Sequence, residues 1–174
     1  LGWRGIRALA NVVTRARELD LLVLLDAKRG DIGSTAQGYA LAYLDDEAPL
    51  RVDAITVNPY LGLDALAPFM HVARDTGRGI FVVTKTSNPG SGDFQDRDVE
   101  GHPLYEVVAG SLRETAEGLA GPESGWASLG IVIGATYPEQ GALLRSILPT
   151  ALFLVPGYGA QGGSAADAAR GFVR

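Results

Sequence analysis

Apolar runs and amphipathic stretches alternate along this chain and predict a repeated strand and helix pattern. The stretch 3–18 predicts an amphipathic helix, because its apolar residues recur at helical spacing, at Ile6, Leu9, Ala10, Val13 and Ala16. Uninterrupted apolar runs predict strands buried on both faces, at 21–28, 54–60, 79–86, 129–136 and 151–157. Helical patterns fill the intervals between the strands, at 36–46, 63–76, 104–119 and 138–147. Ser164 is a candidate cap for a last helix over 164–173.

The alternation of strands and helices predicts a parallel sheet of the α/β class, in one domain over 1–174. Polar residues and glycines follow every predicted strand, in the segments DAKRGD, NPYLG, TKTSNPGSG, GATYPE and PGYGAQGG. Both an open doubly wound sheet and a closed (β/α)8 barrel use the carboxyl ends of their strands for chemistry. Five such ends favour the barrel, whose loops all converge on one mouth. Because a barrel has eight strands and about 250 residues, and five strands are predicted here, we expect a barrel that lacks its ends.

Composition excludes several kinds of site. The chain has no cysteine, which excludes thiol catalysis and cysteine-ligated zinc. Its two histidines, His71 and His102, are far apart, which argues against a histidine-rich metal site or a Ser/His/Asp triad. A net charge of −5 without a basic stripe argues against nucleic acid as a partner. No apolar run approaches the roughly 20 residues that span a bilayer, and no signal-peptide pattern is present, so we expect no membrane partner.

The strongest candidate for chemistry is the segment DAKRGD at 26–31. Because side chains alternate along a strand, Asp26 and Lys28 share one face, and Asp31 can return to the same place or reach a neighbouring subunit. Opposite charges this close keep each other ionised. Such an array suits proton delivery to a developing carbanion, with Lys28 as the acid. A structural ion pair at a strand end is the alternative interpretation.

Other strand ends carry weaker signals. Lys85 ends its strand as Lys28 does, but the polar residues around it favour a solvated lysine over a Schiff-base lysine. The acidic residues of the loop 87–102 favour a solvated, mobile loop over a metal site. Gly157, Gly159 and Gly162 fit the pattern GxGxxG. In a late loop this pattern favours a phosphate cradle of bare N–H groups over a dinucleotide site or a plain turn.

Several of these segments together resemble one known family. DAKRGDIGST at 26–35 resembles the signature D-x-K-x-x-D-I-x-x-T of orotidine 5′-monophosphate decarboxylases. The later strand ends are similar to the longer-chain bacterial group of that family in the same order, at 58–62, 86–95, 131–139 and 155–163. The resemblance implies a homodimeric, cytoplasmic, phosphate-binding barrel. It also implies conversion of orotidine monophosphate to uridine monophosphate and carbon dioxide in pyrimidine biosynthesis, with no metal or organic cofactor.

The resemblance also implies roles for the matching residues of the signature. Asp26 is expected to face the substrate carboxylate, and Lys28 to protonate C6 of the pyrimidine as carbon dioxide leaves. Asp31 and Thr35 are expected to enter the active site of the other subunit. The family has a further catalytic lysine before this segment, and no lysine precedes Asp26 here. We therefore expect the 174 residues on their own to catalyse poorly.

For substrate binding, the resemblance implies that Ser87 meets the pyrimidine edge and that Gln161 grips the phosphate, with Gly159 and Gly162 in the same loop. Arg170 and Arg174 do not match the phosphate-binding arginine of the family, which follows the last strand. Together with the unmatched lysine before Asp26, this comparison with the family implies that two N-terminal strands and the final strand are missing here.

Two other hypotheses stay open. One is a magnesium-dependent sugar-phosphate decarboxylase or synthase of the same barrel superfamily, which shares the D-x-K-x-x-D spacing, although the TSNPGSGDFQ loop favours a nucleotide. The other is a non-catalytic fragment that only binds phosphates.

Overall fold

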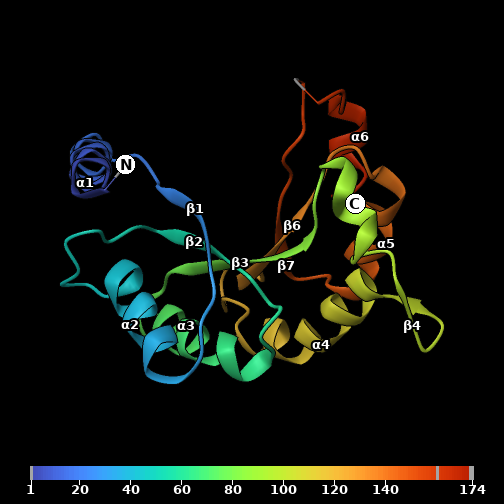
Figure 1. The fold of residues 1–174 in the computed structure, drawn as a ribbon, viewed down its shortest axis with the longest axis horizontal. Coiled ribbons are helices and arrows are strands. Elements are labelled where there is room, and N and C mark those ends of the chain that lie inside the picture. The colour runs from blue at the N-terminus through green and yellow to red at the C-terminus, as the bar shows by residue number, and fades with distance from the viewer. Residues whose placement is uncertain (1, 160, 173–174) are drawn as a thin grey trace. The chain divides into compact units, whose positions relative to one another are not determined.

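A computed structural model describes residues 2–159 and 161–172 of the chain. The chain divides between Ile80 and Phe81 into two compact units, and Figure 1 labels their helices and strands. The first unit contains, in order, α1 (Gly2–Glu18), β1 (Leu24–Arg29), α2 (Gly33–Leu44), β2 (Ala54–Val57) and α3 (Leu63–Thr76). Strand β3 (Gly79–Lys85) runs across the division. The second unit continues with η1 (Pro89–Asp93), β4 (Asp98–Val99), β5 (His102–Pro103), α4 (Leu104–Gly118), β6 (Ala127–Ile133), α5 (Pro138–Ile147), β7 (Ala151–Leu154) and α6 (Ala165–Ala169).

In the first unit, β1 and β2 pair in parallel, with Leu24 opposite Ala54. Helices α2 and α3 pack against each other. The core of this unit consists of fully buried apolar side chains on β2 and both helices, among them Ala36, Leu44, Ile55, Leu66 and Phe69. Helix α3 ends at Gly77, whose φ of 71° is the left-handed conformation that glycine adopts at helix ends.

In the second unit, the sheet order is β3, β6 and β7. Strands β6 and β7 pair in parallel, with Ile131 opposite Phe153. Buried side chains of β3, β6, α4 and α5 form the core, among them Val82, Leu112, Leu129 and Leu144. The parallel strands with helices between them confirm the predicted α/β class. The prediction of one domain over 1–174 stays a prediction.

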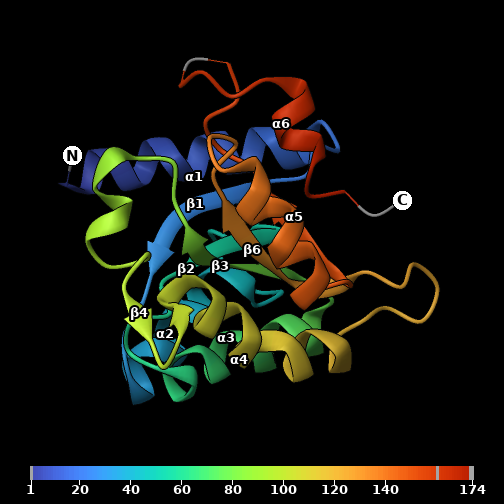
Figure 2. The same ribbon diagram turned by 90° about the vertical axis from the view of Figure 1, so that its right-hand side faces the viewer.

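The predicted polar loop 87–102 contains regular structure that the sequence pattern does not indicate. It begins with the short helix η1, and β4 and β5 then form an antiparallel hairpin, with Val99 opposite His102. Glu100 and Gly101 turn the hairpin with positive φ angles of 55° and 89°. The hairpin contacts α4, as Figure 2 shows.

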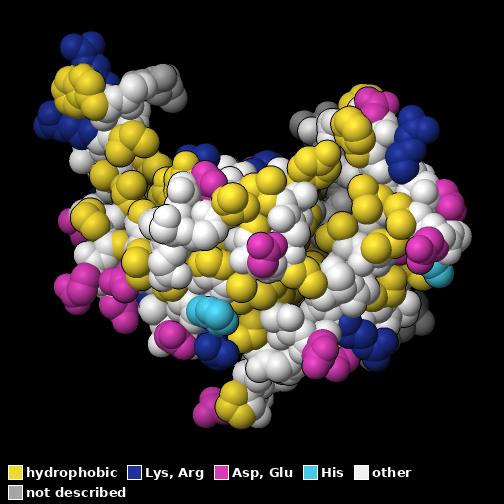
Figure 3. Space-filling model, turned by 60° about the horizontal axis from the view of Figure 1, so that its bottom comes forward, with side chains coloured by type: hydrophobic (Ala, Val, Ile, Leu, Met, Phe, Trp, Pro, Cys, Tyr) yellow, Lys and Arg dark blue, Asp and Glu magenta, His cyan; other side chains and the backbone are white. Residues whose placement is uncertain are grey.

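Burial at the start of the chain is lower than predicted. The strand expected at 21–28 begins at Leu24, and none of its residues is fully buried, so the prediction of burial on both faces is wrong. Helix α1 is present as predicted, but Val13 is its only fully buried residue among those described, and Ile6 is 52% exposed. Figure 3 shows apolar side chains of α1 exposed on the surface. An apolar run indicates side chains that are stabilised by burial, but whether they are buried depends on which other segments pack against them.

The last helix is shorter than predicted. Ser164 caps it as expected, because its hydroxyl accepts from the N–H of Asp167 while the Asp167 carboxylate accepts from Ser164. The helix ends at Ala169, before Gly171, and residues 173 and 174 lie outside the described residues. Of the helices described between residues 2 and 172, with residue 160 left out, none is long and apolar enough to cross a membrane.

Candidate active site

The carboxyl end of β1 carries a close pair of opposite charges. Asp26 and Lys28 lie on the exposed face of the strand, and the Lys28 ammonium donates to both carboxylate oxygens of Asp26 at 2.6 Å. The hydrogen bond from Lys28 lowers the pKa of the Asp26 carboxyl below its usual value, against the opposing effect of partial burial. The hydrogen bond from Lys28 therefore favours the ionised form of the Asp26 carboxylate.

Thr56 of β2 hydrogen-bonds both members of this pair, although the local sequence pattern does not mark it as a site residue. Its side chain is fully buried, its hydroxyl donates to Asp26 Oδ1 at 2.9 Å, and it accepts from the Lys28 backbone N–H at 2.9 Å. Lys28 has a φ of 47°, and the register between β1 and β2 shifts between Leu25 and Arg29. One hydroxyl thus holds both the carboxylate and the unusual backbone of the lysine. Asn58 is the first residue of the polar segment NPYLG, and strand alternation places Thr56 on the same face as Asn58. This alternation is the sequence signal that would have identified Thr56.

Within the part of the chain that the structure describes, Asp31 and Thr35 are not hydrogen-bonded to the charged pair. A carboxylate oxygen of Asp31 accepts from the N–H of Ile32 at 2.8 Å, and Thr35 is exposed in the first turn of α2. Among the described residues, no hydrogen bond joins either side chain to Asp26 or Lys28. The expectation that both residues serve another subunit stays a prediction.

In the second unit, Ser87 follows β3 and lies against two glycines. A Cβ atom at Gly134 would lie 2.8 Å from Ser87 Cα, so only glycine allows this approach. A Cβ atom at Gly157 would lie 3.1 Å from Ser87 Cβ and 3.0 Å from Gln161 Oε1. The structure therefore brings Ser87 and Gln161 to the same glycine, and the sequence analysis did not assign this role to Gly134 or Gly157.

The glycine-rich loop differs from the expected cradle of bare N–H groups. The N–H of Gly159 donates to the carbonyl of Gly163 at 2.8 Å, and the N–H of Gly162 donates to the carbonyl of Gly159 at 2.9 Å. These donors are therefore occupied within the loop. Both glycines have positive φ angles, 75° and 93°, so their conformational freedom shapes the turn. The resemblance assigns Gly159, Gln161 and Gly162 of this loop to substrate binding. Of these three, Gln161 has the side chain that can still contact a ligand.

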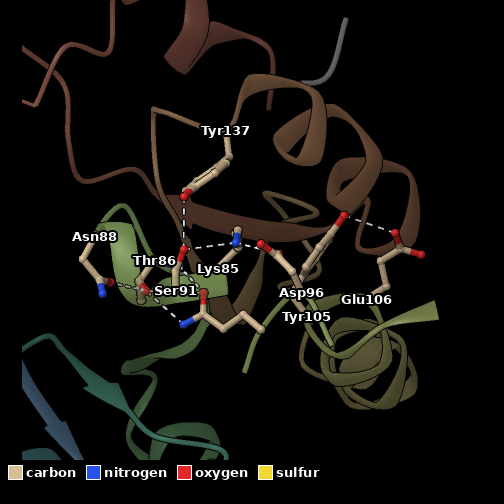
Figure 4. Close-up of polar contacts among 9 residues, drawn as sticks. Lys85, Thr86, Asn88, Ser91, Asp96, Tyr105, Glu106 and Tyr137 are labelled. Carbon is tan, nitrogen blue, oxygen red and sulfur yellow. Dashed lines mark hydrogen bonds and ion pairs between the residues drawn. The ribbon is translucent and has the colours of Figure 1, made fainter. Parts of the chain in front are cut away.

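Lys85 is buried, and the prediction of a solvated lysine is wrong. Its side chain has no exposed surface, and its ammonium donates to Asp96 Oδ1 at 2.6 Å and to Ser91 Oγ at 3.1 Å (Figure 4). The rings of Tyr137 and Tyr105 lie 4.3 and 5.9 Å from the ammonium. Burial, together with the neighbouring Glu106, raises the pKa of the Tyr105 hydroxyl to about 12. Lys85 is thus buried by contacts with residues distant in the sequence, Tyr105 and Tyr137, which its polar neighbours in the chain do not indicate.

The acidic loop has a structural use. Asp96 pairs with the buried lysine, and Asp98 accepts from the N–H of Gly101 within the hairpin. Within residues 2–159 and 161–172, no three Asp, Glu or His side chains gather in the way that a metal ion would require.

A charged pair at the carboxyl end of one parallel strand, and a glycine-lined serine in the loop after another, are features typical of α/β enzymes of the barrel type. The chain belongs to the orotidine 5′-phosphate decarboxylase / HUMPS family, whose model matches residues 4–172. This confirms the family resemblance. Members of the family are TIM barrels, and the five parallel strands of this chain agree with part of such a fold.

Individual relatives agree with this assignment. The chain is 47% identical over 171 residues to the orotidine 5′-phosphate decarboxylase of Rhodopirellula baltica, covering 96% of this chain and 56% of the relative. It is 49% identical over 162 residues to that of Halorubrum lacusprofundi, covering 92% and 52%. The structure of Leishmania donovani OMP decarboxylase matches with a TM-score of 0.73 and 43% identity, covering 91% of this chain and 58% of that one. The chain spans about half the length of the curated relatives that it matches.

Proposed function

We propose that the protein decarboxylates orotidine 5′-monophosphate to uridine 5′-monophosphate and carbon dioxide, as a carboxy-lyase of pyrimidine biosynthesis. The observation that carries the proposal is the Asp26–Lys28 pair at the end of β1, inside a segment that matches the family signature. Family membership over residues 4–172 supports the same reaction. No metal or organic cofactor enters the proposed chemistry.

In the proposed reaction, the bond between C6 of the pyrimidine and its carboxylate breaks, and the electron pair stays on C6. The Lys28 ammonium stabilises this developing carbanion and transfers a proton to C6, and solvent then reprotonates the amine. Asp26 orients the ammonium, because both of its carboxylate oxygens accept from Lys28 Nζ at 2.6 Å. Asp26 also faces the substrate carboxylate, which adds repulsion in the ground state.

Substrate binding is proposed for residues of the second unit. Ser87 meets the pyrimidine edge, and Gln161 grips the phosphate from a turn that Gly159 and Gly162 shape. The support is that Ser87 and Gln161 both lie against Gly157.

We further propose a homodimer in which Asp31 and Thr35 complete the active site of the other subunit. The support is the signature at 26–35, together with the observation that neither side chain hydrogen-bonds Asp26 or Lys28 of its own chain in the described residues. The proposal includes one phosphate-binding barrel domain over 1–174, a cytoplasmic location, and no nucleic-acid or membrane partner. Because the relatives described above are named orotidine 5′-phosphate decarboxylases and not sugar-phosphate enzymes, we do not propose the magnesium-dependent alternative.

The test is loss of orotidine monophosphate absorbance with the full-length protein, with and without a chelator. We expect turnover that the chelator leaves unchanged, and a loss of about 10²–10⁴-fold in kcat for Lys28→Ala. Arg113→Ala is the matched control, because Arg113 pairs with Glu117 on the exposed surface of α4. A wild-type protein without turnover, or a Lys28→Ala variant with unchanged turnover, would contradict the proposal.

A further inference from the structure

The buried ammonium of Lys85 has no part in the reaction proposed above. It ends β3, and Ser87 lies two residues further along the chain. Taking an ammonium out of water costs several kcal/mol, and a buried ion pair is often no more stabilising than an apolar replacement. Stability of the fold therefore does not explain a lysine at this position. The lysine is better explained by the segment that its ammonium holds in place.

The ammonium holds the segment 86–96, which we call the serine loop. It donates to Ser91 Oγ in the middle of the loop and to Asp96 Oδ1 at its end, so one cation fixes two points (Figure 4). The face of the Tyr137 ring lies over the same ammonium at 4.3 Å. The hydroxyl of Tyr137 also hydrogen-bonds Ser91 Oγ at 3.1 Å. The loop is therefore attached to the segment that follows β6 as well as to β3.

A second set of hydrogen bonds closes the same loop at its base. The N–H of Thr86 donates to Gln95 Oε1 at 2.9 Å, and Gln95 Nε2 donates to Thr86 Oγ1 at 2.9 Å. The N–H of Gln95 donates to the carbonyl of Ser91 at 3.0 Å. These bonds make the loop one closed unit, whose position depends on its attachment points.

Ser87 lies inside this closed loop, with little room to move. The Lys85 carbonyl accepts from the N–H of Gly134 at 2.8 Å, and the Ser87 backbone lies against the bare Cα of that glycine. On its other side, Ser87 faces Gly157 and the end of the Gln161 side chain. A small displacement of the serine loop would therefore change the direction of the Ser87 hydroxyl.

We propose that Lys85 is a positioning residue, which holds Ser87 in its substrate-binding orientation by fixing the serine loop through Ser91 and Asp96. This inference rests on the proposed function for the role of Ser87 in meeting the pyrimidine edge. It deepens that function by adding a residue that does not touch the substrate.

The test compares Lys85→Met, which keeps the length of the side chain and removes the charge, with Lys85→Arg, which restores a cation. Arg145→Met is the matched control for a general loss of stability in the second unit. The Arg145 guanidinium is also partly buried, but it donates to the carbonyls of Gly171 and Ala151, and none of its hydrogen bonds within the described residues reaches the serine loop. Two readouts are followed in each full-length variant: hydrogen exchange at the amides of the serine loop, and the dissociation constant for uridine monophosphate.

We expect Lys85→Met to speed exchange at the Thr86 and Gln95 amides about tenfold, and to raise the dissociation constant by a similar factor. Lys85→Arg is expected to recover part of both effects, and Arg145→Met to leave both at the wild-type level while lowering the melting temperature. Wild-type exchange in Lys85→Met, or equal effects in Arg145→Met, would overturn the inference. If Lys85→Met does not fold, Asp96→Asn tests the same attachment from its half-exposed end, and unchanged exchange there would count against it. If the wild-type protein does not bind uridine monophosphate, the proposed function fails, while the exchange rates still decide whether Lys85 holds the loop.

Discussion

Replacing Thr56 by valine tests how the charged pair is held. Valine has nearly the shape of threonine but no hydroxyl, so Asp26 loses a donor and the Lys28 N–H loses its acceptor. A buried donor left without a partner costs about 1–3 kcal/mol. For a domain of this size, 1 kcal/mol corresponds to roughly 2–4 °C in melting temperature. We therefore expect Thr56→Val to melt about 2–12 °C below the wild type.

The same substitution has a pH signature. The Thr56 hydroxyl adds to the effect of Lys28 in lowering the pKa of Asp26, so Thr56→Val raises that pKa towards the ordinary value of 3.8. A carboxyl with a lowered pKa in the folded protein contributes stability above its unfolded pKa and loses it as the pH falls through the folded value. In Thr56→Val this contribution to stability is smaller and its loss is complete at a higher pH, and the acid limb of the pH–rate profile also moves to higher pH.

Thr56→Ser is the matched control, because serine keeps the hydroxyl and removes one methyl group. Thermal unfolding, a carboxyl NMR titration of Asp26 and a pH–rate profile are measured for both variants. We expect serine to retain the wild-type pKa and acid limb. The reasoning is refuted if Thr56→Val retains both as well, or if serine shifts them as far as valine does.

Three further outcomes are expected. Lys28→Ala raises the pKa of Asp26, because the hydrogen bond from Lys28 is the largest cause of its lowering, and an unchanged NMR titration would contradict this. Mixed Lys28→Ala and Asp31→Ala proteins regain part of the activity through hybrid dimers; no recovery under conditions of subunit exchange would argue against a shared site. Gly134→Ala costs about 1–3 kcal/mol in urea unfolding, because its Cβ would overlap the Ser87 backbone. Gly110→Ala on α4 meets open space and is expected to be neutral or stabilising, and equal losses in the two variants would show that crowding is not the cause.

The order of strands and helices could be predicted because each element carries its own periodic pattern. Helix α3 matches its predicted range at both ends, with Gly77 as the stop signal. Burial could not be predicted so well. The apolar run before Asp26 reads as a strand covered on both faces, yet Leu22 is 89% exposed. Cover depends on which other segments pack there, and a local pattern does not contain that information.

The charged pair could be predicted from a local pattern, but the residues that contact and hold it could not. Asp26 and Lys28 are two residues apart in one strand, so alternation alone places them together. The contacts of Thr56 with Asp26 depend on strand pairing across 30 residues. The burial of Lys85 depends on a loop that folds back and on Tyr137, 52 positions away along the chain, so polar neighbours in the sequence gave the wrong environment.

The most direct test of the proposed function is to run the reaction in deuterium oxide and to examine the product by NMR. If Lys28 delivers an exchangeable proton to the carbanion, the full-length protein converts orotidine monophosphate to uridine monophosphate that carries deuterium at C6, and Lys28→Ala yields almost none. No uridine monophosphate from the wild-type protein would contradict the proposed function. Deuterated product at the same rate from Lys28→Ala would contradict the assignment of Lys28 as the proton donor.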